Sequence, residues 1–255
     1  MVKRSQAKDL VVKENIRGEE GTYVDITVLR GENAEETPLH VERRSIEVPT
    51  VEYQMLENQV GYIYVTQFDE VTAKQFEDAI DDLEDQGMEK LVIDLRNNPG
   101  GVLDTAVEML AYVLPEDKLD GMLVYTADKN GEGDRYFCKD GKIQRESDDG
   151  SRDSRYPKED DHELDVPLAV LVNGNSASAS EVFTGAVMDY DAGIVVGTTT
   201  FGKGIVQNLI PLGDGTAIKL TTAHYYTPNG FDLHGKGLEP DVVVEMDGEL
   251  QKKAV

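Results

Sequence analysis

The sequence predicts a layered α/β fold, and three observations support this prediction. From about residue 48 onward, strand-like segments alternate with amphipathic helical segments, as in a sheet covered by helices. Some of these strands are short and almost continuously apolar, which is typical of strands buried on both faces of a sheet. The 255 residues are 39% hydrophobic, an ordinary globular composition with room for one large domain and a small partner.

Residues 1–47 are predicted to form a small unit that is incomplete by itself. A helical stretch at Ala7–Ile16 precedes a strand with period-2 alternation at Thr22–Arg30. A turn at Gly31–Asn33 leads to a return strand at Leu39–Arg43. Two strands and one helix bury too little apolar surface for an independent core, so we expect this unit to pack against other residues.

Residues 48–245 are predicted to form the main core, followed by a tail at 246–255. The first half of the core is expected to contain the strand Val60–Phe68, the amphipathic helix Thr72–Gln86, the buried strand Leu91–Leu95, the helix Leu103–Leu114 and the strand Met122–Tyr125. Gly87 and Pro115 are the signals that end the two helices.

The second half of the core begins with a polar, turn-rich stretch at 126–164. Within it, Arg145–Glu163 is rich in charge and almost devoid of apolar residues, so we interpret it as a solvated surface loop. The elements expected after this loop are the strand Leu168–Val172, a helix from Ser178 to Asp189, and strands at Gly193–Gly197, Val206–Leu212 and Ala217–Thr222.

The charge of the chain excludes two classes of partner. A formal net charge of −25 repels nucleic acid and anionic lipid. The single cysteine, Cys138, allows no internal disulfide. The basic start at Met1–Ser5 is not followed by an apolar run, so neither a signal peptide nor a membrane span is expected within this chain. The sequence predicts no metal site and no cofactor.

A serine-rich segment at Asn173–Phe183 follows a predicted buried strand and leads into a predicted helix. A hydroxyl at such a junction lies close to the free N–H groups of a helix N-terminus, which can receive a developing oxyanion. The alternative is structural, because Ser178 and Glu181 also match a helix capping box.

A lysine between two glycines, Lys203, lies in the segment Thr200–Gln207. Desolvation between close backbone segments disfavours the ammonium form, which is what a lysine general base requires. The net negative charge of the chain opposes this loss of a proton, although salt screens it beyond about 8–10 Å. The alternative is an exposed turn lysine, and the glycine spacing is not that of a phosphate-binding loop.

Paired glycines end a third segment, Asp94–Gly101, where another buried strand gives way to a helix. Glycines let backbone N–H groups approach a ligand closely. The alternative is a simple tight turn.

Together and in this order, these segments resemble the carboxyl-terminal processing (tail-specific) protease family. The stretches that carry the resemblance are Arg96–Gly101, Ser176–Glu181, Phe201–Gln207, Thr227–Gly230 and Gly237–Asp241, within a similarity that runs from about residue 10 to residue 245. The resemblance implies a crotonase/ClpP-like protease core of mixed α/β structure, and it implies that residues 6–47 are the last part of a PDZ domain.

The resemblance also assigns roles to individual residues. It implies that Ser178 is the nucleophile, that Lys203 is its general base at the spacing usual for the family, and that Gln207 orients the lysine. The backbone N–H groups of Ala179 and of Gly100 or Gly101 would form the oxyanion hole. Asp189 matches a helix aspartate that we interpret as structural, and Thr198 replaces an acidic residue common in the family.

Substrates implied by the resemblance are proteins or peptides, either unfolded or cut near their C-termini. It also implies an extracytoplasmic location for the full-length parent and leaves a homo-oligomer open. Two alternatives stay open: a catalytically silent or gated peptide-binding module of the same fold, and a Ser-His-Asp hydrolase. None of the histidines lies in a motif that marks a base, and no Gly-x-Ser-x-Gly elbow is present; the histidines are His40, His162, His224 and His234.

Overall fold

A computed structural model describes residues 16–31, 34–44, 47–114, 121–139, 142–155, 164–213 and 216–245 of the chain. The chain divides into two compact units, Met1–Val48 and Pro49–Val255. Each unit is described separately below.

The first unit contains an antiparallel hairpin of β1 (Tyr23–Arg30) and β2 (Glu35–Glu42). The predicted strand at Thr22–Arg30 is present, and the return strand begins four residues earlier than predicted. His40 stacks on Tyr23 with 4.6 Å between ring centroids, and its Nδ1 atom lies 2.6 Å from Asp25. The predicted helix Ala7–Ile16 lies almost entirely outside the described residues. The PDZ assignment of this unit stays a prediction.

The second unit is built on a six-stranded sheet in the order β14-β11-β10-β5-β4-β3. Its strands are β3 (Val51–Leu56), β4 (Val60–Val65), β5 (Lys90–Asp94), β10 (Leu168–Val172), β11 (Ile194–Gly197) and β14 (Val242–Val243). All neighbouring strands are parallel except the β3–β4 pair. The sheet therefore has one edge at which five carboxyl ends meet.

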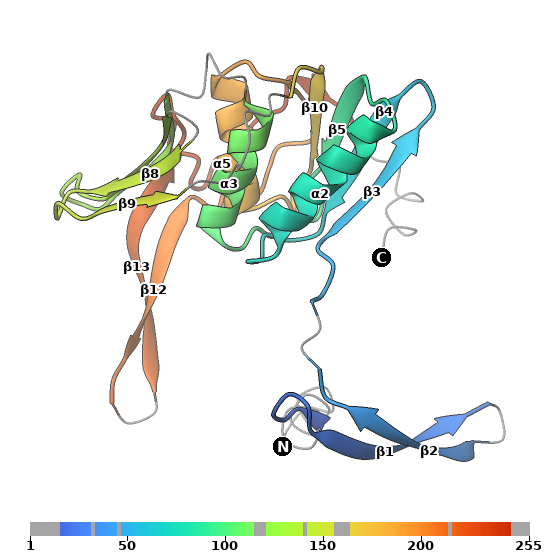
Figure 1. Cartoon of the computed structure of the whole chain (residues 1–255). Helices are drawn as coiled ribbons and strands as arrows, with labels where there is room; N and C mark the ends of the chain where they lie inside the picture. The colour runs from blue at the N-terminus through green and yellow to red at the C-terminus, as the bar shows by residue number, and fades with distance from the viewer. Residues whose placement is uncertain are drawn as a thin grey trace. The chain divides into compact units, whose positions relative to one another are not determined.

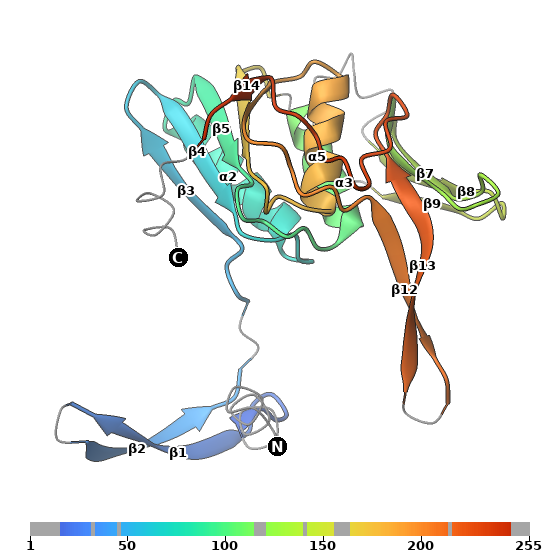
Figure 2. The same cartoon turned by 180° about the vertical axis from the view of Figure 1, so that it is seen from behind.

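Three helices lie over one face of this sheet (Figures 1 and 2). They are α2 (Thr72–Asp85), α3 (Leu103–Val113) and α5 (Ala179–Asp189). The apolar stripe predicted for the first helix is the buried one, since Phe76, Ile80 and Leu83 are at most 1% exposed. The layered mixed α/β fold predicted from the sequence is confirmed. No helix in the described part of the chain has the length and apolar character needed to cross a membrane.

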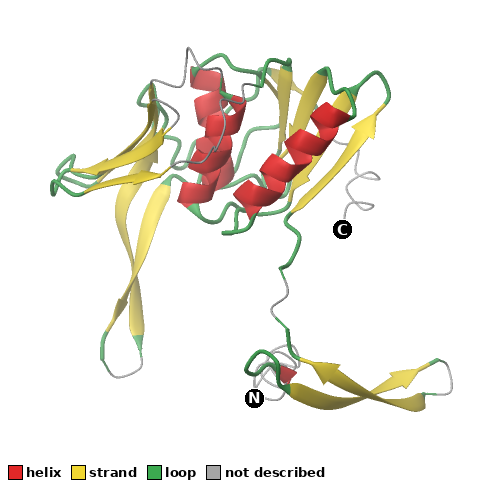
Figure 3. Ribbon diagram, viewed as in Figure 1, coloured by secondary structure: helices red, strands yellow, loops and turns green. Residues whose placement is uncertain are grey.

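A second six-stranded sheet has the order β12-β13-β6-β7-β8-β9 and is antiparallel throughout (Figure 3). Its strands are β6 (Gly121–Ala127), β7 (Asp134–Lys139), β8 (Lys142–Ser147), β9 (Arg152–Arg155), β12 (Ile205–Pro211) and β13 (Ala217–Tyr226). Helix α3 contacts β6 and β8, and α5 contacts β6, so these two helices lie between the sheets.

The prediction of a solvated surface loop at Arg145–Glu163 is wrong for its first part, because the end of β8 and all of β9 lie there, and the turn-rich stretch at 126–164 holds three strands. Strands β7, β8 and β9 fall within it, although residues 156–163 lie outside the described part of the chain. The apolar signal is sparse but alternates, because Tyr136 and Cys138 on β7 and Ile143 on β8 are all at most 7% exposed. Charged residues on the other face hide this alternation in the sequence.

A carboxylate in the turn after β8, Asp148, bonds this turn to the start of β7. Asp148 accepts hydrogen bonds from the Arg135 guanidinium at 2.6 Å and from the Gly133 N–H at 3.0 Å. The ion pair with Arg135 and then the Gly133 N–H lower the pKa of Asp148 below its ordinary value. This contact stabilises the β7–β8 hairpin while the carboxylate is ionised.

Candidate active site

The Asp94–Gly101 turn and the serine segment meet because the strands that precede them, β5 and β10, are neighbours. β5 and β10 pair in parallel, with Asp94 opposite Leu171, so the turns that follow them leave the same edge of the sheet side by side. Ser176 Oγ donates to the Leu95 carbonyl at 2.8 Å, and the Ala177 N–H donates to the Asn98 carbonyl at 3.0 Å. The Asp94–Gly101 turn and the serine segment are therefore directly bonded to each other.

Ser178 has a backbone conformation that few L residues adopt. Its φ is 58° and its ψ is −115°, outside the region that left-handed asparagine and aspartate residues usually occupy. Strain of this kind concentrates at functional sites, and a strained serine between a strand and a helix is typical of a nucleophile elbow. Neither neighbouring serine shares this geometry, and Ser176 and Ser180 are fully buried. The structure thus distinguishes Ser178 from the other serines of the segment.

A buried carboxylate, Glu181, joins the serine segment to the lysine segment. Its Oε2 accepts from the Ser178 N–H at 2.9 Å and from the Lys203 N–H at 2.8 Å. Its Oε1 accepts from the Thr200 hydroxyl at 2.6 Å and from the Gly202 N–H at 2.7 Å. The sequence suggested only a helix cap for this residue. The structure shows that it also fixes the backbone that carries the lysine.

The N–H groups around Ser178 differ in their availability. Gly100 donates its N–H to the side-chain oxygen of Asn98 at 2.9 Å. Within the described part of the chain, the N–H groups of Ala179 and Gly101 have no hydrogen-bond partner. A Cβ atom at Gly100 would lie 2.8 Å from Ser178 Cβ, so the glycine turn lies against the serine. Of the two glycines that the sequence left open, Gly101 keeps its donor free.

The Lys203 backbone is linked to Ser178 through Glu181, but no bond among the described residues joins the side chains of Lys203 and Gln207 to Ser178. The Lys203 side chain is half-buried, and no hydrogen bond among the described residues joins its Nζ to Ser178 Oγ. Gln207 is exposed on β12 and donates to Thr221 Oγ1 at 3.3 Å. The lysine backbone is in place, whereas a contact between the three side chains is absent from the described residues.

Sequence reasoning missed a second buried carboxylate, Asp94, which supports the glycine turn. Its side chain is 2% exposed and accepts the Arg96 Nε at 2.9 and 3.0 Å and the Tyr62 hydroxyl at 2.6 Å. Burial and the adjacent Asp94 raise the pKa of Tyr62, so this hydroxyl stays protonated and can donate. The hydrogen bonds of Asp94 to Arg96 and Tyr62 fix the start of the turn that ends in Gly100 and Gly101.

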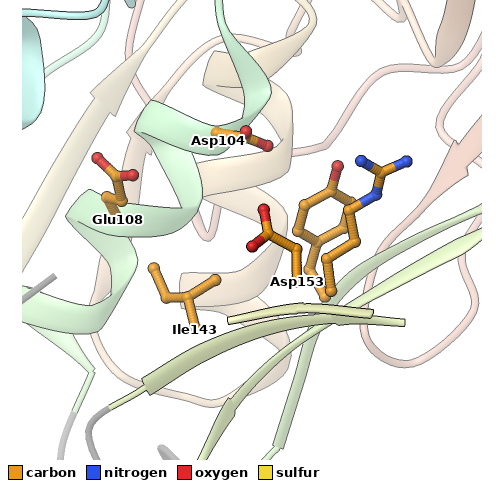
Figure 4. A pocket seen from close by; sticks show the side chains of 6 residues that line it. Asp104, Glu108, Ile143 and Asp153 are labelled. Atoms are coloured by element: carbon orange, nitrogen blue, oxygen red, sulfur yellow. The ribbon is translucent and has the colours of Figure 1, made fainter. Parts of the chain in front are cut away.

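Two hollows lie near these residues. A cavity of about 400 Å³ at the carboxyl ends of β10 and β11 is lined by residues that include Arg96, Asn173 and Thr198. A narrow pocket between α3 and strands β8 and β9 is lined by Asp104, Glu108 and Asp153 among others (Figure 4), and it contains none of the predicted catalytic residues. Within the described ranges, no three His, Cys, Asp or Glu side chains converge to hold a metal ion.

Two further residues that the sequence singled out, Asp189 and His224, have partners other than Ser178. Asp189 accepts the Asn229 N–H at 2.7 Å, which agrees with a role in holding the Thr227–Gly230 loop. His224 lies on β13 opposite Ile205, with its Nδ1 3.6 Å from Asp232. This pair has no contact with Ser178 among the described residues.

The comparisons with known proteins give the family of the chain. The family model for peptidase family S41 matches residues 59–244, and the chain belongs to this family. This assignment confirms the resemblance to carboxyl-terminal processing proteases. The matched range contains the serine, lysine and glycine segments.

Particular relatives define the similarity further. A probable CtpA-like serine protease of Staphylococcus aureus (strain COL) is 38% identical over 242 residues, which are 95% of this chain and 44% of the relative. A protein of the same description from Staphylococcus haemolyticus is 38% identical over 236 residues, 92% of this chain and 42% of the relative. The chain therefore spans less than half the length of these relatives. Among solved structures, the photosystem II D1 C-terminal processing protease is 28% identical with a TM-score of 0.61, over 89% of this chain and 57% of that chain.

Proposed function

We propose that this chain is a serine endopeptidase in which Ser178 is the nucleophile and Lys203 is the general base. The observation that carries the proposal is the Glu181 carboxylate, which holds the strained Ser178 backbone and the Lys203 backbone with one oxygen atom. The two residues are thereby fixed at one site although they come from different segments.

The proposed reaction follows from this geometry. Neutral Lys203 takes the proton of Ser178 Oγ, and Oγ attacks the carbonyl carbon of the scissile peptide bond. The N–H groups of Ala179 and Gly101 donate to the oxyanion that forms. Collapse breaks the C–N bond, the leaving amine takes the proton from Lys203, and water then hydrolyses the acyl-enzyme. The first step requires a rotation of the half-buried Lys203 side chain towards Ser178.

Gln207 is proposed to orient Lys203 once that rotation has occurred. It lies on the same strand that follows Lys203, and its present partner, Thr221, is held by a single bond of 3.3 Å. Exchange of this bond for one to the lysine needs only a new side-chain conformation.

Proposed substrates are unfolded or extended protein segments, cut near their C-termini. Support comes from membership in family S41 and from the similarity to a protein described as a C-terminal processing protease. An extracytoplasmic location in the full-length parent is proposed on the same family resemblance, and cell fractionation with an antibody against this chain tests it.

Casein digestion by the purified chain tests the proposal. We expect cleavage by the parent, and loss of cleavage by about 10³-fold or more in Ser178→Ala and in Lys203→Met. His224→Ala should keep the parent rate. Digestion by Ser178→Ala at the parent rate would refute the nucleophile, and loss in His224→Ala at unchanged stability would favour a Ser-His-Asp hydrolase.

A further inference from the structure

Strands β12 and β13 continue beyond the rest of their sheet as a two-stranded arm (Figures 1 and 2). Only the base of the arm has a third strand, because β6 pairs with His224, Tyr225 and Tyr226 alone. The remaining pairs, from Gln207 opposite Thr221 to Pro211 opposite Ala217, have no neighbouring strand on either side among the described residues. An isolated hairpin is marginally stable in water, so an arm of this length normally has a partner.

One face of the arm is apolar and exposed. Ile210 lies directly opposite Ile218, and the period-2 alternation of a strand places Leu212 and Leu220 on the same face as this pair. Their exposed fractions are 43% for Ile210, 54% for Leu212, 48% for Ile218 and 48% for Leu220. Large apolar side chains gathered on one exposed face mark an interaction surface. We call these four residues the apolar face of the arm.

The charge of the arm separates it from the rest of the chain. Between Ile205 and Tyr226 the sequence contains one acidic residue, Asp214, and one lysine, Lys219, whereas the whole chain carries a net charge of −25. An acidic segment is repelled by the chain as a whole, but an apolar uncharged segment meets no such repulsion at the arm. The arm therefore suits an apolar polypeptide.

The backbone of the arm favours an extended partner. β12 is at the edge of its sheet, so its outer N–H and C=O groups can pair with another strand. Such pairing supplies affinity that does not depend on sequence, while the apolar face selects hydrophobic side chains. The arm also begins at Ile205, two positions after Lys203, and Phe201 on the other side of the lysine is 63% exposed.

The size of the apolar face argues against a stable dimer of two arms. Four side chains that are each about half exposed provide far less than the roughly 800 Å² per partner that a standard stable interface buries. A surface of this size fits a transient contact with a polypeptide that passes to the active site.

We propose that the β12–β13 arm is a docking surface for extended, apolar segments of unfolded protein substrates. The apolar face holds hydrophobic side chains, the outer edge of β12 pairs with the substrate backbone, and the continuity of β12 with the lysine segment leads the substrate towards Ser178. This inference deepens the proposed function and rests on it.

A double substitution on the apolar face tests the proposal. Ile218→Thr with Leu220→Thr places β-branched threonines on the strand and removes apolar surface, while Ala217→Thr with Lys219→Thr places the same residues on the opposite face. Both pairs are made in the full chain, with and without Ser178→Ala. Binding of fluorescein-labelled casein to the Ser178→Ala proteins is measured by anisotropy, and the active proteins are assayed on casein and on a tetrapeptide anilide.

We expect the apolar-face variant to bind casein about tenfold more weakly, with kcat/KM for casein reduced in proportion. Tetrapeptide kinetics and the control variant should stay within about twofold of the parent. Unchanged casein binding would overturn the proposal, as would an equal loss on both substrates. If the parent sediments as a dimer and the apolar-face variant as a monomer, the proposal is also overturned, in favour of contact between two copies. If the parent cleaves neither substrate, but the apolar-face variant still binds casein more weakly than the parent, the proposed function is refuted and the docking surface is supported.

Discussion

The substitution Glu181→Gln separates the effect of the charge and acceptors of the buried carboxylate from the effect of its size. The glutamine side chain has the same size, but it replaces one acceptor oxygen by an NH₂ donor. The amide is expected to face Thr200 and Gly202, because the Thr200 hydroxyl can turn and accept a hydrogen bond. The Gly202 N–H then has no acceptor in a site where Glu181 is completely buried.

The cost can be worked from the four hydrogen bonds. An unsatisfied buried N–H costs about 1–3 kcal/mol, and each of the remaining bonds weakens because its acceptor is no longer charged. The total is about 3 kcal/mol, which corresponds to a fall in Tm of about 6–12 °C for a domain of this size. Since Ser178 and Lys203 both lose their common anchor, we expect a displacement of these groups that slows serine labelling about 100-fold.

Scanning calorimetry and the rate of reaction with a fluorophosphonate measure the two effects. Glu70→Gln is the matched control, because Glu70 is an exposed residue of the same type, and it should match the parent in both assays. A Glu181→Gln protein whose Tm and labelling rate both equal those of the parent would refute the reasoning.

Three further predictions concern the glycine turn, the buried ion pair at its start and the β7–β8 hairpin. Gly101→Ala would place a Cβ atom 1.9 Å from the Phe68 carbonyl oxygen, so we expect a loss of about 1–3 kcal/mol in urea unfolding and slower cleavage, which an unchanged midpoint would contradict. Arg96→Leu leaves the Asp94 carboxylate buried without its cation, which should lower the free energy of unfolding by about 3–5 kcal/mol in the same measurement. A loss no larger than that caused by replacing an exposed arginine by leucine would disprove this prediction. Ion pairing lowers the pKa of Asp148, so its stabilising effect is present above the unfolded pKa of about 3.9 and is lost as the pH falls through the lower folded value. Asp148→Asn should therefore lower Tm at pH 7 and leave it unchanged near pH 2.

The sequence was sufficient to predict how the main core is built. The helix Thr72–Gln86 and the strand Leu91–Leu95 have strong local patterns, and the structure places them within a residue or two of the predicted limits. The contact between the Asp94–Gly101 turn and the serine segment comes from the parallel pairing of β5 and β10, which the sequence pattern alone did not establish. Strands β7 to β9 escaped prediction because their buried face consists of few apolar residues among many charges.

Contacts between distant segments could not be derived from the sequence. Glu181 matches a local capping box, and nothing in the sequence shows that its carboxylate also reaches Lys203. The choice between Gly100 and Gly101 as an oxyanion donor depends on the side chain of Asn98, which takes one of the two N–H groups. The side-chain conformation of Gln207 likewise depends on its neighbour across the hairpin.

Peptide mapping by mass spectrometry after reaction of the full chain with a fluorophosphonate tests the central claim most directly. The account predicts a single covalent adduct on Ser178 that is almost absent in Lys203→Met. An adduct on Ser176, on Ser180 or on a serine outside this segment would contradict the account. So would labelling of Ser178 at a rate that the loss of Lys203 does not change.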